Sequence, residues 1–231
     1  MSNNSNARSS RRSNGSGATP KKTSPKRLFW ICALLLILIV AGGGCGFISA
    51  TLSNLPDVSN VRPSASSQIY DVHGNLITTV HSTENRLPVP LKDVPKDLQN
   101  AFVATEDSRF YSHHGIDPVG ILRAVWVNIV HSGVSEGGST ITQQLARNAF
   151  LSQDRTFKRK ISEALLALKI EQHYTKDEIL EMYMNQIYFG QGAYGVQSAA
   201  HVYFGKDASQ LTLAQAALIA GLPQSPNYYS P

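Results

Sequence analysis

The pattern of apolar and polar positions divides the 231-residue chain into a polar tail, one uninterrupted apolar run and a mixed remainder. Residues 1–27 are rich in Ser, Asn and Gly and have almost no apolar side chains to bury, which predicts disorder. Residues 28–52 form the apolar run. The remainder predicts a Pro- and Ser-rich tether with a β-hairpin over 53–90, followed by a helical domain over 91–231.

Residues 28–52 predict a single transmembrane helix, because they contain no charged residue and a spanning helix needs about 20 apolar residues. The basic flank before the run places the N-terminus in the cytoplasm, so everything after about Asn54 lies outside the membrane. A cleaved signal peptide is the alternative, but the run and the basic tail are both long for one. Cys32 and Cys45 fall inside the run, so the outer segment has no cysteine for a disulfide or a thiol nucleophile.

The positive charge of the chain belongs to its tail. Residues 1–27 hold seven Lys and Arg residues and no acidic residue, which leaves 14 basic and 16 acidic residues in the remainder. The outer domain therefore does not have the basic character of a nucleic-acid-binding domain, and we expect no nucleic-acid partner.

The outer segment opens with a hairpin signal and then becomes helical. The apolar stretches around Ile69 and Leu76 flank the turn sequence His-Gly-Asn, which predicts a short β-hairpin. Helical spacing prevails from Val94 onward, so the domain is predicted to be mainly α. One helix is expected to begin after the N-cap Asp117, and another opens with a capping box that starts at Thr175.

The stretch from Glu106 to Gly115 concentrates groups that could carry chemistry. Glu106 is a candidate acid–base residue, although a helix C-terminus followed by a polar loop is the better interpretation of this stretch taken alone. His113 and His114 do not indicate a metal site, because adjacent side chains diverge and no second ligand cluster has metal spacing.

The stretch from Gly137 to Arg147 combines glycines with polar and charged residues at helical spacing. Gly137 and Gly138 precede a Ser- or Thr-capped helix, a possible anion site, and Thr140, Gln144 and Arg147 follow one face of that helix. A solvated polar face is an equally good interpretation of this stripe.

Glu163 falls among apolar positions of a long helix that is predicted to run through the core, with Arg159 one turn away. A carboxylate in such surroundings needs a partner, which makes it a functional candidate. The alternative is a simple ion pair with Arg159. Glycosyl chemistry needs one group that moves a proton and a second that manages the leaving group or the developing charge. Glu106 and Glu163 are the candidates for these two roles.

Four stretches in order resemble the motifs of glycosyltransferase family 51, the peptidoglycan glycosyltransferase domain of class A penicillin-binding proteins and their monofunctional relatives. The first motif is carried by Glu106, Asp107, Phe110, His113 and Gly115. The second runs from Gly137 through Ser139, Thr140, Gln143 and Gln144 to Arg147 and Asn148. The third consists of Arg159, Lys160 and Glu163. The fourth contains Lys176, Ile179, Leu180, Tyr183 and Asn185. The resemblance covers roughly residues 65–231.

This resemblance implies a lysozyme-like, bilobal α fold that dips into the outer face of the membrane. It implies that lipid II is polymerised into β-1,4-linked glycan strands, with inversion and release of undecaprenyl pyrophosphate. Glu106 would be the general base, and Glu163 would lie near the donor pyrophosphate, directly or through a divalent cation (Mg or Mn). The residues that would hold the pyrophosphate are Thr140, Gln144, Arg147, Arg159 and Lys160. The other expected substrate-binding residues are Asp107, Phe110, His113, Ser139, Gln143, Asn148, Tyr183 and Asn185.

The implied setting is the bacterial cell (inner) membrane, crossed once, with membrane lipid, the growing strand and wall-synthesis or division proteins as partners. Arg147 stands where the family often has Lys. The family's fifth motif and every transpeptidase signature are absent, so we expect a fragment of a class A protein whose domain lacks its C-terminal end. A lysozyme-like hydrolase and a non-catalytic scaffold of a wall-synthesis complex are the alternative functions.

Overall fold

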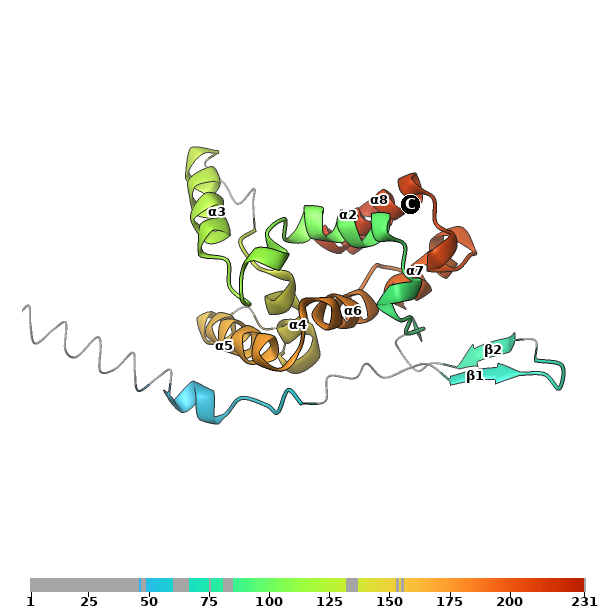
Figure 1. Cartoon of the computed structure of the whole chain (residues 1–231), viewed down its shortest axis with the longest axis horizontal. Helices are drawn as coiled ribbons and strands as arrows, with labels where there is room; N and C mark the ends of the chain where they lie inside the picture. The colour runs from blue at the N-terminus through green and yellow to red at the C-terminus, as the bar shows by residue number, and fades with distance from the viewer. Residues whose placement is uncertain are drawn as a thin grey trace, which may run out of the picture. The chain divides into compact units, whose positions relative to one another are not determined.

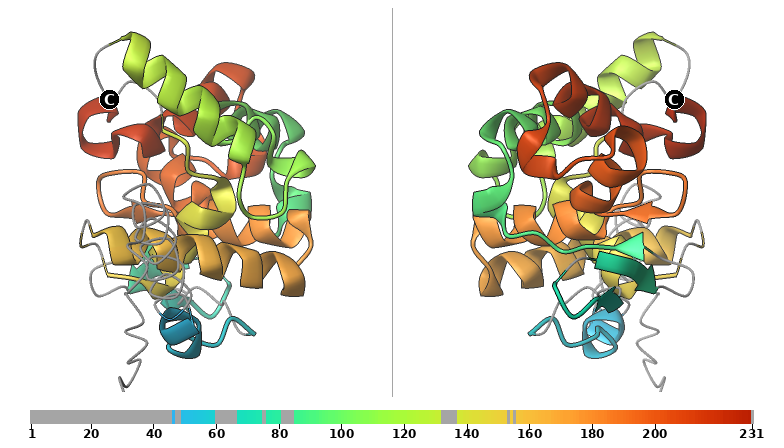
Figure 2. Two further views of the ribbon diagram at one scale, coloured as in Figure 1. Left: turned by 90° about the vertical axis from the view of Figure 1, so that its left-hand side faces the viewer. Right: turned by 90° about the vertical axis from the view of Figure 1, so that its right-hand side faces the viewer.

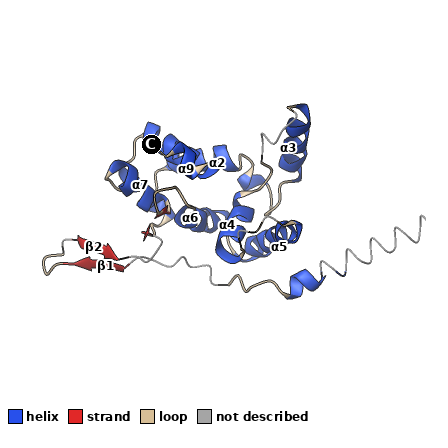
Figure 3. Ribbon diagram, turned by 180° about the vertical axis from the view of Figure 1, so that it is seen from behind, coloured by secondary structure: helices blue, strands red, loops and turns tan. Residues whose placement is uncertain are grey.

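Helices account for most of the secondary structure in the computed structural model, as expected from the sequence (Figures 1 and 3). The structure describes residues 46, 49–59, 67–74, 76–80, 85–131, 137–152, 154 and 156–230. The labelled α-helices are α2 (Lys96–Glu106), α3 (Pro118–Val130), α4 (Ile141–Phe150), α5 (Phe157–His173), α6 (Lys176–Gln186), α7 (Val196–Phe204), α8 (Leu213–Gly221) and α9 (Pro226–Tyr229). Residues 49–53 are also helical. Short 3₁₀ helices span Leu91–Asp93, Phe110–Ser112, Ala208–Gln210 and Leu222–Gln224.

The predicted hairpin is present. Strand β1 (Ser67–Tyr70) pairs antiparallel with β2 (Leu76–Val80), with a register shift between Ile69 and Tyr70. A second, very short sheet pairs β3 (Asn85–Arg86) in parallel with β4 (Ala193–Tyr194). Parallel pairing joins residues far apart in sequence, so this sheet brings the segment before the helices beside the end of α6.

The helix starts follow the capping signals of the sequence. Asp117 caps α3 by accepting a hydrogen bond from the amide of Val119, and Thr175 forms the predicted capping box with Glu178 at the start of α6. Thr140 forms a capping box at the start of α4 in the same way. Each box satisfies backbone N–H groups that would otherwise lack partners in the first turn.

The hydrophobic core lies between two groups of helices. Helix α4 packs against α5 and α6, and α2 packs against α8 (Figure 1). Phe102 of α2, Tyr183 of α6 and Phe189 meet edge to face at the centre, with ring centroids about 6 Å apart. These rings are fully buried, so they pack α2 against α6 and against the segment that follows α6.

Side chains from the helical domain hold two segments that precede it. Val58 is fully buried in the core, and the carbonyl oxygens of Pro56 and Val58 accept hydrogen bonds from Lys169 and Tyr174 of the α5 end. The side chain of Asn185 both donates to and accepts from the backbone of Val89, at 2.8 and 2.9 Å. Part of the predicted tether is therefore docked on the helices.

Helix α3 lies at an edge of the helical unit (Figures 1 and 2). It exposes a large apolar surface. Only Gly120 and Ala124 of this helix are buried. Its exposed large apolar residues are Val119, Ile121, Leu122, Val125, Trp126, Ile129 and Val130. The predicted transmembrane helix falls largely outside the described residues, and no helix among those that are described is long and apolar enough to cross a membrane.

Candidate functional site

Two pockets meet beside α4. One has a volume of about 670 Å³ and is lined by Glu106, Ser139 and Arg123. The other has a volume of about 570 Å³ and runs toward β4. Gln144, Arg147 and Pro223 line both, so the polar face of α4 forms the boundary between them. The predicted stripe of Gln144 and Arg147 therefore faces a hollow surface.

Glu106 ends α2 at the wall of the larger pocket. Its carboxylate accepts a 2.7 Å hydrogen bond from Nε2 of Gln144. Partial burial raises the pKa of Glu106, against the lowering effects of the Gln144 hydrogen bond and the charge of Arg147. A carboxylate with a raised pKa that faces a pocket is a suitable proton acceptor.

The loop after Glu106 is fixed by a buried contact between a carboxylate and a histidine ring. Asp107 contacts Nε2 of His113 at 2.9 Å and accepts a 3.1 Å hydrogen bond from the amide of Ile141. It thus ties the end of α2 to the first turn of α4. The neighbouring His114 is exposed, so the two histidines diverge as expected.

Gly115 allows this loop to lie directly on α5. Its φ is +86°, and a Cβ atom there would come within 2.9 Å of the backbone of Ala167. The carbonyl of Gly115 also accepts a 2.7 Å hydrogen bond from the hydroxyl of Thr140. A larger residue at this position would move the loop away from α5.

Thr140 and Gln143 are buried and serve the structure of the α4 start. They form its capping box, and Thr140 additionally bonds Gly115. Ser139, one residue earlier, lines the larger pocket. Within the predicted second motif, the larger pocket is thus lined by Gly137, Ser139, Gln144 and Arg147 rather than by the capping residues.

Glu163 is only 1% exposed and lines neither pocket. It forms ion pairs with Arg159, as the i,i+4 spacing predicted, and with Lys160 at 2.8 Å. The ammonium group of Lys160 also donates a 2.6 Å hydrogen bond to Ser139 at the pocket wall. Glu163 therefore holds two cations, one of which reaches the larger pocket through Ser139.

The predicted divalent cation finds no preformed protein site here. Both oxygens of Glu163 contact the cations of Arg159 and Lys160, which leaves this carboxylate poorly suited to hold a metal. In the described part of the chain, no three His, Cys, Asp or Glu side chains gather as metal ligands.

Three other predicted substrate-binding residues are buried. Phe110 packs in the core with the ammonium of Lys176 4.4 Å from its ring centre. Asn185 holds Val89, as described above. Tyr183 is 1% exposed, and its hydroxyl donates to Oε1 of Gln144 at 3.3 Å. Asn148, in contrast, is exposed and lines the smaller pocket.

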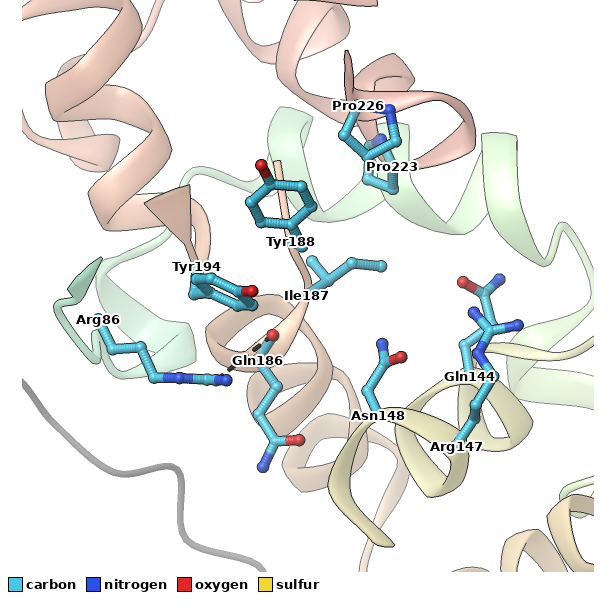
Figure 4. Close-up of a pocket in the computed structure, with 10 residues that line it drawn as sticks. All are labelled: Arg86, Gln144, Arg147, Asn148, Gln186, Ile187, Tyr188, Tyr194, Pro223 and Pro226. Atoms are coloured by element: carbon cyan, nitrogen blue, oxygen red, sulfur yellow. Dashed lines mark hydrogen bonds between the residues drawn. The ribbon is translucent and has the colours of Figure 1, made fainter. Parts of the chain in front are cut away.

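The smaller pocket contains residues that were not predicted as site residues (Figure 4). Arg86 stacks on the ring of Tyr194 at 4.7 Å, and the rings of Tyr188 and Tyr194 lie 4.9 Å apart. Figure 4 shows this group across the pocket from Gln144 and Arg147. The sequence signal that could have found them is the cluster of tyrosines that follows the fourth motif, but Arg86 becomes a neighbour only through the pairing of β3 with β4.

Comparison with known proteins confirms the resemblance seen in the motifs. Penicillin-binding protein 1A of Escherichia coli is 51% identical over 208 residues, which cover 89% of this chain and 24% of that protein. Penicillin-binding protein 1F of Bacillus subtilis is 45% identical over 212 residues, which cover 91% of this chain and 29% of that protein. The chain thus spans about a quarter of the length of these curated relatives.

Among solved structures, the crystal structure of penicillin-binding protein 1A from Haemophilus influenzae matches 73% of this chain and 16% of that chain, with 29% identity and a TM-score of 0.34. The family model described as Transglycosylase matches residues 73–231. Because this match covers more than half of the sequence, the chain belongs to the transglycosylase family.

Proposed function

We propose that this domain is a peptidoglycan glycosyltransferase that polymerises lipid II into β-1,4-linked glycan strands. The observation that carries the proposal is the position of Glu106, a carboxylate with a raised pKa at the wall of a pocket that also contains Arg147. Membership of the transglycosylase family supports the same reaction class.

In the proposed reaction, Glu106 accepts the proton of the acceptor's 4-hydroxyl group. The hydroxyl oxygen forms a bond to C1 of the donor sugar, while the bond from C1 to the diphosphate breaks and the electron pair leaves with undecaprenyl pyrophosphate. Attack opposite the leaving group converts the α-linked donor into a β-linked product. A general base of this kind contributes about a hundredfold to ten-thousandfold in rate.

The cations beside the pocket would stabilise the leaving diphosphate. Arg147 lines both pockets, and Lys160 reaches the larger one through Ser139. Guanidinium and ammonium groups form strong charge-assisted hydrogen bonds with phosphate oxygens. Glu163 would act one step removed, by orienting Arg159 and Lys160. The start of α4 and the loop after Glu106 would be held in place by Thr140, Gln143 and Asp107.

We also propose that the domain works at the outer surface of the bacterial cell membrane in a lysozyme-like, bilobal arrangement. The exposed apolar surface of α3 supports contact with lipid, because a soluble helix seldom exposes so many large apolar side chains. The uncharged run over 28–52 supports an anchor with a cytoplasmic N-terminus. Wall-synthesis or division proteins would be partners in this setting.

The test is polymerisation of labelled lipid II by the detergent-solubilised full chain, with Glu106→Gln beside it. The variant is expected to lose at least a hundredfold in rate, because an amide cannot accept the proton. Asp97→Asn, an exposed change on the same helix α2, is the matched control and is expected to retain activity. Equal polymerisation by the parent and Glu106→Gln would refute the role of the base. Release of reducing ends from finished peptidoglycan would favour the hydrolase instead.

A further inference from the structure

The amide of Gln144 lies between two partners that differ in hydrogen-bonding character. Its Nε2 donates to Oε2 of Glu106 at 2.7 Å, and its Oε1 accepts from the hydroxyl of Tyr183 at 3.3 Å. We propose that Tyr183 is a positioning residue that fixes the orientation of the Gln144 amide, so that its NH₂ group always faces the Glu106 carboxylate. This inference rests on the proposed role of Glu106 as the base.

The surroundings of Tyr183 keep its hydroxyl protonated, so that it donates a hydrogen bond. The side chain is 1% exposed, and burial raises its pKa well above the usual range, so the phenol keeps its proton. Among the described residues, Gln144 is the acceptor with which this hydroxyl forms a hydrogen bond. Rotating the amide by half a turn would deprive the buried O–H of its acceptor.

The same rotation would also be unfavourable at Glu106. It would turn Oε1 of Gln144 toward an ionised carboxylate, and two acceptors repel each other. Protonated Glu106 could instead donate to that oxygen. The orientation set by Tyr183 therefore favours the ionised, proton-accepting form of Glu106, and loss of the hydroxyl makes the protonated form easier to reach.

Other charged groups face Glu106, but they do not depend on the amide. Arg147 of α4 favours the ionised form and the adjacent Asp107 opposes it. Arg123 of α3 lines the same pocket. Because Tyr183→Phe leaves all three in place, a change in the titration of Glu106 reports the orientation of Gln144.

The first experiment follows the ¹³C-labelled carboxyl group of Glu106 by NMR during a pH titration. Tyr183→Phe retains the ring that packs against Phe102, so the fold is expected to remain. The titration midpoint should rise in Tyr183→Phe. It should stay unchanged in Tyr174→Phe, a matched control that loses a hydroxyl bonded to Val58 instead. In a Gln144→Ala background, Tyr183→Phe should produce no further shift.

The second experiment measures lipid II polymerisation as a function of pH. Tyr183→Phe should lose roughly five- to tenfold on the acidic side and less than about twofold on the alkaline plateau, as expected for one hydrogen bond of ordinary strength. An unchanged midpoint in the NMR titration, or an equal loss of rate at every pH, would overturn the inference. The NMR titration needs no catalysis, so failure of the parent to make polymer would count against the proposed function alone.

Discussion

Glu106 and Glu163 belong to two motifs that are expected to serve the same site, yet their surroundings differ in burial and in hydrogen-bond partners. Glu106 is partly exposed on a pocket and is hydrogen-bonded by a neutral amide, and burial raises its pKa. Glu163 is 1% exposed and lies between the cations of Arg159 and Lys160. One carboxylate can exchange a proton with a bound molecule, whereas the other has its charge already neutralised within the protein.

Under the proposed function, two carboxylates would serve one site without both being acids or bases. A general base must be accessible and must have a pKa high enough to accept a proton. Partial burial raises the pKa of a carboxyl group in this way. A carboxylate that orients cations must keep its partners, and Glu163 contacts both Arg159 and Lys160. The comparison can be tested by making the same substitution at both positions.

The largest difference is expected in stability. Glu163→Gln should lower the free energy of unfolding by about 3 kcal/mol, because removing one member of a buried pair leaves the other charge without compensation. Here the side chain of Glu163 is 2% exposed and that of Arg159 is 16% exposed. Glu106→Gln should cause no such loss. Chemical denaturation of both variants measures this, and equal stability of the two would remove the distinction between them.

A smaller, pH-dependent difference is expected between the parent and Glu106→Gln. The pKa of Glu106 is raised on folding from an ordinary value of 4.5, so its protonated form contributes stability that is fully present below that pH. This contribution is lost as the pH rises through the folded-state pKa. Glu106→Gln lacks the titration, so relative to the parent it should become more stable as the pH rises from 4 to 8. Melting temperatures measured across this range would reveal the trend, and a constant or reversed gap would contradict it.

Local sequence signals predicted the elements that depend on neighbouring residues. The capping box at Thr175, the N-cap at Asp117 and the ion pair between Arg159 and Glu163 are all present, because each joins residues within one or two turns. The family motifs added Gln144 and Arg147, which do line the pockets.

Features that depend on distant partners could not be predicted in this way. Val58 lies in a Pro- and Ser-rich stretch that has the composition of a tether, yet it is buried against helices formed more than a hundred residues later. Asn185 belongs to a motif expected to bind substrate, and its amide instead matches the backbone of Val89. Arg86 reaches the smaller pocket only because β3 pairs with β4. A single sequence does not contain these pairings as local patterns.

The smallest effect is expected from Ser139→Ala, which removes a contact between the surroundings of Glu163 and the pocket that Glu106 lines. Lys160 joins them, because its ammonium contacts both Glu163 and Ser139 at the pocket wall. Ser139→Ala removes the pocket-side contact and retains the ion pair, so the free energy of unfolding should change by less than about 0.5 kcal/mol. Polymerisation should fall about two- to fivefold, because Lys160 is no longer held toward the pocket. Ser152→Ala is the matched control, since its hydroxyl contacts only the exposed Asp154 in the described structure. If Ser139→Ala behaves like that control in rate assays, Glu163 does not act on the pocket through the contact between Lys160 and Ser139.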